Sequence, residues 1–143
     1  MMDPTTFKKR LRNVCLRSQF YSLPRKLHDR HVLFHAISMT LDAETLYTEV
    51  ELNDALKGWL AQLAPEANSD HVTLRRALVD YRYLVRDTHG RQYQINPEAP
   101  ASPLTMAPEV AQVDVRSFLT QAIQEETARR AQARARYVQP SQD

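Results

Sequence analysis

The spacing of hydrophobic residues predicts two helices within the first 41 residues. Phe7, Leu11 and Val14 recur at the interval of one helix face. Asp3 followed by Pro4 is typical of a helix start, with an N-cap and proline at the first helical position. Pro24 disfavours helical geometry at the residue before it, so we expect the first helix to end before this proline. A second helix is then expected over residues 25–41. The broad apolar face of this second helix holds Leu27, Val32, Leu33, Phe34, Ile37 and Leu41.

Two further helices are indicated between residues 48 and 82. Thr48 and Glu51 have the spacing of a capping box at the start of a helix over residues 48–63. Its apolar stripe consists of Leu52, Leu56, Trp59 and Leu60. A polar loop follows, and we expect Ser69 to cap a helix over residues 69–82. Leu74, Leu78 and Tyr81 define the buried face of that helix.

A β-hairpin is predicted directly after residue 82. Leu84 and Val85 lie on its first strand, and Tyr93 and Ile95 lie on its second. Gly90 suits the turn because glycine adopts positive φ readily. Helices followed by a hairpin indicate a mainly α fold with a small β-hairpin, a winged helix-turn-helix. In this interpretation residues 48–63 support a recognition helix at residues 69–82, and the hairpin is the wing.

The rest of the chain is expected to extend this winged helix at both ends. We predict a basic amphipathic helix in residues 1–22, the winged-helix domain in 23–96, a proline-rich linker in 97–112, and a C-terminal helix and tail in 113–143. Asp114 is a suitable cap for the last helix, which has an apolar patch at its front. Its rear is mostly alanine and arginine with little to bury, so it is expected to be either a partly ordered tail or, if ordered, a helix that packs on another chain or on the body.

Composition excludes several classes of protein. Only two glycines occur in 143 residues, which argues against phosphate-binding glycine-rich loops. Cys15 stands alone, so neither a disulfide framework nor a cysteine zinc site is expected, and a cytoplasmic location fits best. The N-terminus lacks the apolar stretch of a signal peptide, and no apolar run is long enough to span a membrane.

Charge is small in total but unevenly distributed. The formal net charge is +2, yet residues 1–31 hold eight lysines and arginines against two aspartates. Residues 42–70 hold seven acidic residues against Lys57, and residues 71–95 hold five arginines against Asp80 and Asp87. A molecule with a basic side and an acidic side is therefore expected, and the basic side is compatible with nucleic acid.

Several of these blocks resemble a bacterial family known as domain of unknown function 2087. The resemblance covers roughly residues 10 to 95 and rests on three stretches, "LPRK", "YTEVELNDAL" and "DHVTLRRALVDYRYLVRD...GRQY", which include Thr48, Glu49, Glu51, Leu52, Asn53, Asp70, Thr73, Leu74, Arg75, Arg76, Leu78, Val79, Asp80, Tyr81, Arg86 and Tyr93. The resemblance implies a winged-helix-like domain associated with transcription regulators. This chain has Arg82 and Tyr83 between Tyr81 and Leu84, where members commonly have a glycine.

Arg75 and Arg76 have two competing interpretations. At the start of a recognition helix they are placed to contact bases and phosphates. Alternatively, Arg76 pairs with Asp80, or Arg75 pairs with Glu49 or Glu51 on the preceding helix. Adjacent helical residues point about 100° apart, so both arginines cannot occupy one groove equally well.

Catalytic and metal sites are not expected. His31 and His35 have the spacing of two metal ligands, but no HExxH pattern or nearby cysteine accompanies them. No nucleophile has an evident base beside it, so we expect no enzyme activity, no metal and no cofactor.

The sequence as a whole predicts a bacterial, cytoplasmic winged-helix protein that binds double-stranded DNA and regulates transcription, with RNA as a further option. The predicted contacts are His71, Thr73, Arg75 and Arg76 on the helix; Arg86, His89 and Arg91 on the wing; and Lys8, Lys9, Arg10 and Arg12 at the N-terminus. The competing hypothesis is a protein-interaction module on the same scaffold. A homodimer through the N-terminal or C-terminal helix is also considered.

Overall fold

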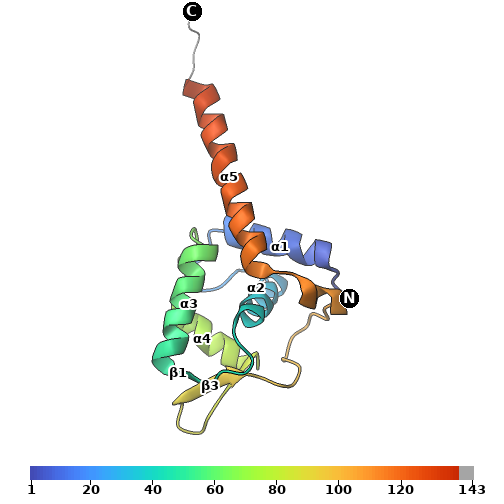
Figure 1. Cartoon of the computed structure of the whole chain (residues 1–143), viewed down its shortest axis with the longest axis vertical. Helices are drawn as coiled ribbons and strands as arrows, with labels where there is room; N and C mark the ends of the chain where they lie inside the picture. Colours follow the sequence, from blue (N-terminus) through green and yellow to red (C-terminus); the bar gives the residue numbers. More distant parts are fainter. Residues whose placement is uncertain (139–143) are drawn as a thin grey trace, which may run out of the picture.

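The computed structural model describes residues 1–138, and over that range the protein is mainly α-helical with a small antiparallel sheet (Figure 1). The helices are α1 (Pro4–Leu16), α2 (Leu27–Thr40), α3 (Glu49–Leu63), α4 (His71–Asp80) and α5 (Val115–Val138), with a short 3-10 helix, η1 (Pro108–Gln112). The strands are β1 (Tyr47–Thr48), β2 (Leu84–Arg86) and β3 (Gln92–Ile95). The predicted mainly α fold with a hairpin after the fourth helix is confirmed.

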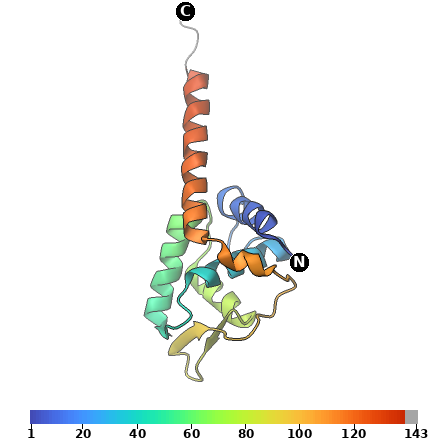
Figure 2. The same cartoon turned by 45° about the vertical axis from the view of Figure 1, so that its right-hand side comes forward.

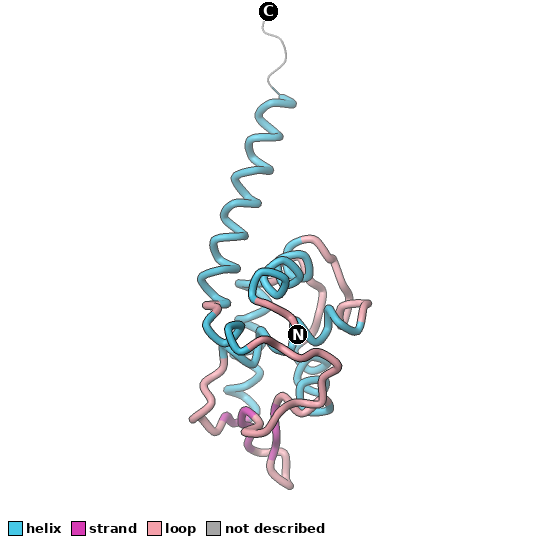
Figure 3. The backbone as a smooth tube through the Cα atoms, turned by 90° about the vertical axis from the view of Figure 1, so that its right-hand side faces the viewer, coloured by secondary structure: helices cyan, strands magenta, loops and turns pink. Residues whose placement is uncertain are grey.

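The β-hairpin and the C-terminal helix lie at opposite ends of the molecule. Figures 1 and 2 show the sheet and the start of α3 at one end of the body and α1 beside the base of α5 at the other, with α3 running from the sheet to the base of α5. The backbone tube in Figure 3 shows α5 extending away from the body on the side opposite the hairpin. No helix within residues 1–138 combines the length and apolar character needed to cross a bilayer.

One hydrophobic core joins all five helices and the hairpin. Phe7, Leu11 and Val14 of α1 are buried, so the predicted apolar face of that helix packs against the body. The predicted stripe of α3 is also buried, from Leu52 to Leu60. Leu27 is an exception, because it lies in the first turn of α2 and is 48% exposed.

The short strand β1 was not predicted. Tyr47 and Thr48 pair antiparallel with Tyr93 and Gln92, which gives a three-stranded sheet in the order β1-β3-β2. Two residues are too few to show the alternation that marks a strand in sequence. The pairing ties the start of α3 to the second strand of the hairpin.

Helix starts follow the predicted capping chemistry with one correction. Asp3 accepts a hydrogen bond from the Thr6 backbone, and the Thr48–Glu51 capping box is present. At α4 the N-cap is Asp70 rather than Ser69. The Asp70 carboxylate accepts from the Thr73 backbone N–H, whereas the Ser69 hydroxyl donates to the carbonyl of Ser22.

The proline-rich segment after the hairpin is held against the body rather than free. The backbones of Met2 and Met106 form a bridge, and the Ala101 N–H donates to the Tyr81 carbonyl. Val110 in η1 is fully buried. Residues 97–112 are irregular for most of their length, as a linker is expected to be, but these contacts fix their path from the hairpin to α5.

The histidine pair considered as a metal site is divided between the core and its edge. His31 is buried, its Nδ1 lies 2.8 Å from the Tyr83 hydroxyl, and burial lowers its pKa. His35 is half-buried with its ring against Phe7. The Tyr83 hydrogen bond and the surrounding aromatic rings account for His31 as a core residue. Within residues 1–138 no three side chains of the metal-binding types gather.

A residue in the left-handed conformation, Arg82, follows the end of α4. Arg82 has a φ of 61°, its N–H donates to the Val79 carbonyl, and the Tyr83 N–H donates to the Leu78 carbonyl. These two bonds form a Schellman motif, whose left-handed position normally holds glycine. Arg82 occupies that position here, so its backbone is strained.

We predict that Arg82→Gly stabilises the protein. Glycine adopts positive φ without strain, and the free energy of unfolding should rise by about 0.5–1 kcal/mol despite the greater freedom of the unfolded chain. Urea denaturation of the wild type and the variant measures this difference. Arg76→Gly within α4 is the control and should lower the free energy of unfolding by about 1 kcal/mol. A loss of stability in Arg82→Gly would contradict the strain.

Candidate nucleic-acid interface

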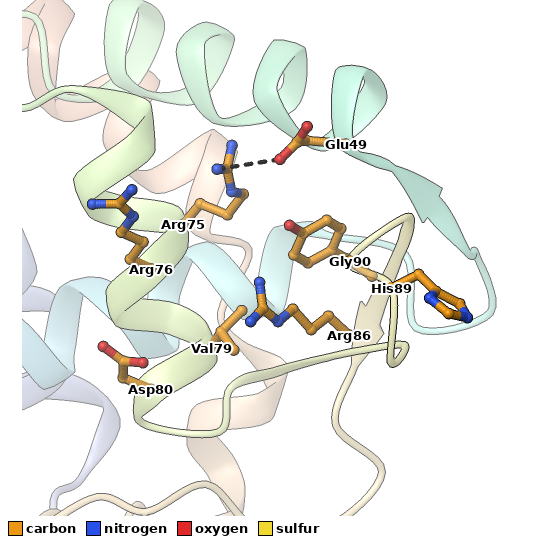
Figure 4. Close-up of a pocket in the computed structure, with 9 residues that line it drawn as sticks. Glu49, Arg75, Arg76, Val79, Asp80, Arg86, His89 and Gly90 are labelled. Atoms are coloured by element: carbon orange, nitrogen blue, oxygen red, sulfur yellow. Dashed lines mark ion pairs between the residues drawn. The ribbon is translucent and has the colours of Figure 1, made fainter.

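A hollow of about 560 Å³ lies between α4, the hairpin and the start of α3 (Figure 4). Three arginines face it from two different elements, Arg75 and Arg76 from α4 and Arg86 from β2. The full lining is Glu49, Arg75, Arg76, Val79, Asp80, Arg86, His89, Gly90 and Tyr93. The hollow thus brings together four of the predicted contact residues, namely the three arginines and His89.

The guanidinium of Arg75 is occupied by contacts within the protein. Its Nη1 donates to Asn53 Oδ1 at 2.6 Å, and its Nη2 lies 3.3 Å from Glu49 Oε1. The guanidinium carbon is 5.9 Å from the centre of the Tyr93 ring, within the range of a cation–π contact. Only 14% of the side chain is exposed. Arg75 therefore connects α4 to α3 and β3. Of the two carboxylates that the ion-pair interpretation offered, Glu49 rather than Glu51 is the partner.

Local sequence places both α3 partners of Arg75 on one face. The capping box starts α3 at Glu49, so the Glu49 carboxylate lies in the first turn, where the helix dipole favours negative charge. Asn53 follows four residues later and therefore lies on the same face. Asn53 and Tyr93 were not predicted as partners of Arg75. The four-residue spacing from Glu49 was a signal for Asn53, whereas nothing local indicated Tyr93.

Arg76 and Arg86 differ from Arg75 in being exposed and unpaired. Within residues 1–138 neither guanidinium has a carboxylate within 4.0 Å, so the predicted pairing of Arg76 with Asp80 is not formed. Figure 4 shows Arg86 reaching from the hairpin toward α4. Two arginines from separate elements thus offer unused hydrogen-bond donors beside one hollow.

The hairpin turn is fixed by its own hydrogen bonds. Asp87 accepts from the backbone N–H groups of Arg91 and Gln92, and these bonds lower the pKa of Asp87. Gly90 has a φ of 67°, which confirms the predicted positive-φ turn. His89 is exposed at the tip of this ordered turn.

Three other predicted contacts lie outside the lining of the hollow. The Thr73 hydroxyl donates to Asp70 Oδ2 at 2.9 Å, so it serves the N-cap of α4. His71 is half-exposed in the first turn of the same helix. Arg91 is exposed beyond the turn. These three side chains border the surface of α4 and the hairpin without lining the hollow.

The basic residues of α1 are not brought to this surface. Lys8, Lys9, Arg10 and Arg12 belong to a helix at the other end of the body from the hairpin (Figures 1 and 2). Arg12 pairs with Glu125 of α5 at 3.2 Å, and Lys8 lies over the Phe118 ring. Those two cations therefore help to hold α5 against α1.

We predict that replacing the two adjacent arginines has unequal effects on stability. Methionine keeps the aliphatic stem but removes the guanidinium. Arg75→Met should lower the free energy of unfolding by about 1–2 kcal/mol, mostly through the lost Asn53 hydrogen bond. The Glu49 carboxylate is half-exposed, so that ion pair contributes less than about 1 kcal/mol. Urea denaturation at neutral pH measures the change.

Arg76→Met is the matched control for this prediction. Arg76 is exposed and has no described ion pair, so its replacement should change stability by no more than about 0.5 kcal/mol. Equal losses in the two variants would contradict a structural role confined to Arg75.

Comparison with known proteins identifies a family without assigning an activity. The model of a family described as an uncharacterized protein conserved in bacteria (DUF2087) matches residues 19–95. That span contains α2, β1, α3, α4, the hairpin and every residue lining the hollow. No curated protein and no solved structure matches the chain. Since the matched span exceeds half of its 143 residues, the chain belongs to the DUF2087 family.

Proposed function

We propose that this protein binds double-stranded DNA through the surface formed by α4 and the hairpin, and that it regulates transcription in the bacterial cytoplasm. The observation that carries the proposal is the pair Arg76 and Arg86. Both are exposed beside one hollow, and neither has a carboxylate partner among residues 1–138. Guanidinium groups of this kind bind phosphate through two parallel hydrogen bonds.

The arrangement of α3, α4 and the hairpin supports DNA as the partner. In a helix-turn-helix protein the second helix of the pair enters the major groove, and its first turns contact base edges. Here α4 is the second helix, and the hairpin follows it directly. Arg75 fixes α4 to α3 and β3, so the helix and the hairpin meet DNA as one rigid unit.

The residues that carry the family resemblance fall into two groups, those that make contacts within the fold and those that do not. Thr48, Glu51, Asp70 and Thr73 cap helices, and Glu49, Asn53, Arg75 and Tyr93 form one set of contacts. Arg76, Asp80 and Arg86 lie in the same resembling stretches but make no side-chain hydrogen bond or ion pair described within residues 1–138. Residues free of a structural task are the better candidates for binding.

The acidic residues of the hollow limit where phosphate can lie. Glu49 is balanced by Arg75, whereas Asp80 is exposed and has no described ion pair within residues 1–138. Asp80 repels phosphate, so we place the phosphate contact at Arg76 and Arg86.

We predict that the double variant Arg76→Gln/Arg86→Gln binds DNA more weakly and with less dependence on salt. Each phosphate contact contributes about 0.9 to the slope of log K against log salt concentration, so two contacts contribute about 1.8. In 0.1 M salt the affinity should fall on the order of tenfold to a hundredfold. Fluorescence anisotropy of a labelled random duplex at several salt concentrations measures both quantities.

The control variant removes two positive charges that lie outside the hollow. Lys57→Gln/Arg116→Gln replaces two exposed cations, on α3 and in the first turn of α5, that do not line the hollow. Its slope should stay within about 0.5 of the wild-type slope, because screened charges outside the interface act weakly. An Arg76→Gln/Arg86→Gln variant with wild-type slope and affinity would refute the proposed surface.

A protein-interaction module remains the second candidate, and one observation favours it. Leu46 and Val50 are 54% and 68% exposed, on either side of β1. The acidic residues Glu44, Glu51 and Asp54 are also exposed there. Apolar groups within an acidic rim suit a basic protein partner. Wild-type protein that fails to bind duplex at low salt, yet binds RNA or a basic peptide, would redirect the function accordingly.

Of the two helices considered for a homodimer, the packing of α1 disfavours α1 and leaves α5. Phe7, Leu11 and Val14 are buried within the chain, so α1 has no comparable apolar face for a second copy. Beyond Glu126 the side chains of α5 described by the structure, up to Tyr137, are all exposed. The mass in solution before and after deletion of residues 127–143 tests a dimer through α5.

A further inference from the structure

The C-terminal half of α5 projects from the body, and its sequence is basic. The helix buries Val115, Leu119 and Ala122, and its last buried side chain is Glu126. From Thr127 to Tyr137 every side chain is exposed. Figures 1 to 3 show this half extending away from the core on the side opposite the hairpin. Residues 127–138 contain four arginines and no acidic residue.

The four arginines lie within the half of the helix surface that packs against the body lower down, with Arg134 and Arg136 at its two edges, about 160° apart. At about 100° per residue, Arg129, Arg130, Arg134 and Arg136 all lie within about 80° of the direction of Glu126. The face that begins with Leu119 and Ala122 thus continues as arginine. We call Arg129, Arg130, Arg134 and Arg136 the arginine face of α5.

Ion pairs engage only the lower part of this face. Glu126 accepts from Arg129 at 2.6 Å and lies 3.4 Å from Arg130, which is also 3.6 Å from Glu66. These contacts hold the pKa of Glu126 at about 2, chiefly through the Arg129 hydrogen bond. Arg134 and Arg136 have no ion pair among residues 1–138. The lower arginines position the helix, and the upper two are free.

The side chains of the projecting half indicate which partner it fits. A protein interface needs apolar groups at its centre, and a membrane-surface helix needs an apolar face with bulky residues. Apart from Tyr137 and the terminal Val138, residues 127–138 are arginine, alanine, threonine and glutamine. A phosphate backbone can be bound through cationic side chains such as arginine without apolar contacts, and small alanines allow close approach of the helix.

We propose that the arginine face of α5 is a second nucleic-acid-binding element, in which Arg134 and Arg136 contact the phosphate backbone. The inference rests on the proposed function in taking DNA as the polyanion, but it does not need the α4–hairpin surface. Because the two elements lie at opposite ends of the molecule, they contact different segments of DNA. Removing either element therefore leaves the other able to bind.

The test compares Arg134→Gln/Arg136→Gln with the wild type in the full chain. Glutamine retains a high helix propensity, so circular dichroism should be unchanged. Binding of a labelled random duplex is measured by anisotropy across a series of salt concentrations. Two lost phosphate contacts should reduce the slope of log K against log salt by about 1.8 and weaken binding on the order of tenfold or more in 0.1 M salt.

The variant of the hollow, Arg76→Gln/Arg86→Gln, and the control Lys57→Gln/Arg116→Gln are run in the same series. Loss of slope in the α5 variant, with the control unchanged, supports the inference whatever the hollow variant does. Wild-type binding in the α5 variant overturns it, and the proposed function stands if the hollow variant still weakens. If only the α5 variant weakens, the α4–hairpin surface is wrong and the arginine face remains. A wild-type chain that fails to bind at low salt overturns both and leaves α5 to an acidic protein.

Discussion

The contact of Arg75 with α3 and the sheet is the interaction on which the candidate site depends. One guanidinium joins three elements, since Arg75 lies on α4, Glu49 and Asn53 on α3, and Tyr93 on β3. The β1–β3 pairing adds a backbone connection between the start of α3 and the same strand. The angle of α4 relative to the hairpin is thereby set within the protein, before any ligand binds, so little ordering has to accompany binding.

The same constraint explains how two adjacent arginines acquire different tasks. Neighbouring residues on a helix diverge by about 100°, so when Arg75 turns toward α3, Arg76 must face elsewhere. Arg76 becomes exposed at the hollow, and Arg86 reaches the hollow from the hairpin. This part of the sequence therefore combines residues that build the surface with residues that are exposed on it. At the far end, α5 repeats this division, with Arg129 and Arg130 paired and Arg134 and Arg136 free.

The predictable parts of the fold are those determined by local chemistry. The Thr48–Glu51 capping box, the stripe of α3 and the turn at Gly90 each depend on residues close in sequence, and each is confirmed. Strand β1 was missed because two residues carry no periodic signal. The path of residues 97–112 depends on contacts with Met2 and Tyr81, which are distant in sequence. For the site, sequence offered Glu49 as a partner of Arg75, but only packing could show that α1 and the hairpin lie at opposite ends.

In the proposed interface Arg75 serves the fold, while Arg76 and Arg86 face the ligand. The most direct measurement follows the Nε–Hε NMR signals of the arginines in the full chain as a short duplex is added. We expect large shifts for Arg76 and Arg86 and almost none for Arg75, whose guanidinium remains in contact with Asn53 and Tyr93. A shift of Arg75 as large as that of Arg76, or no shift of Arg76 and Arg86 under conditions where DNA binds, would contradict it.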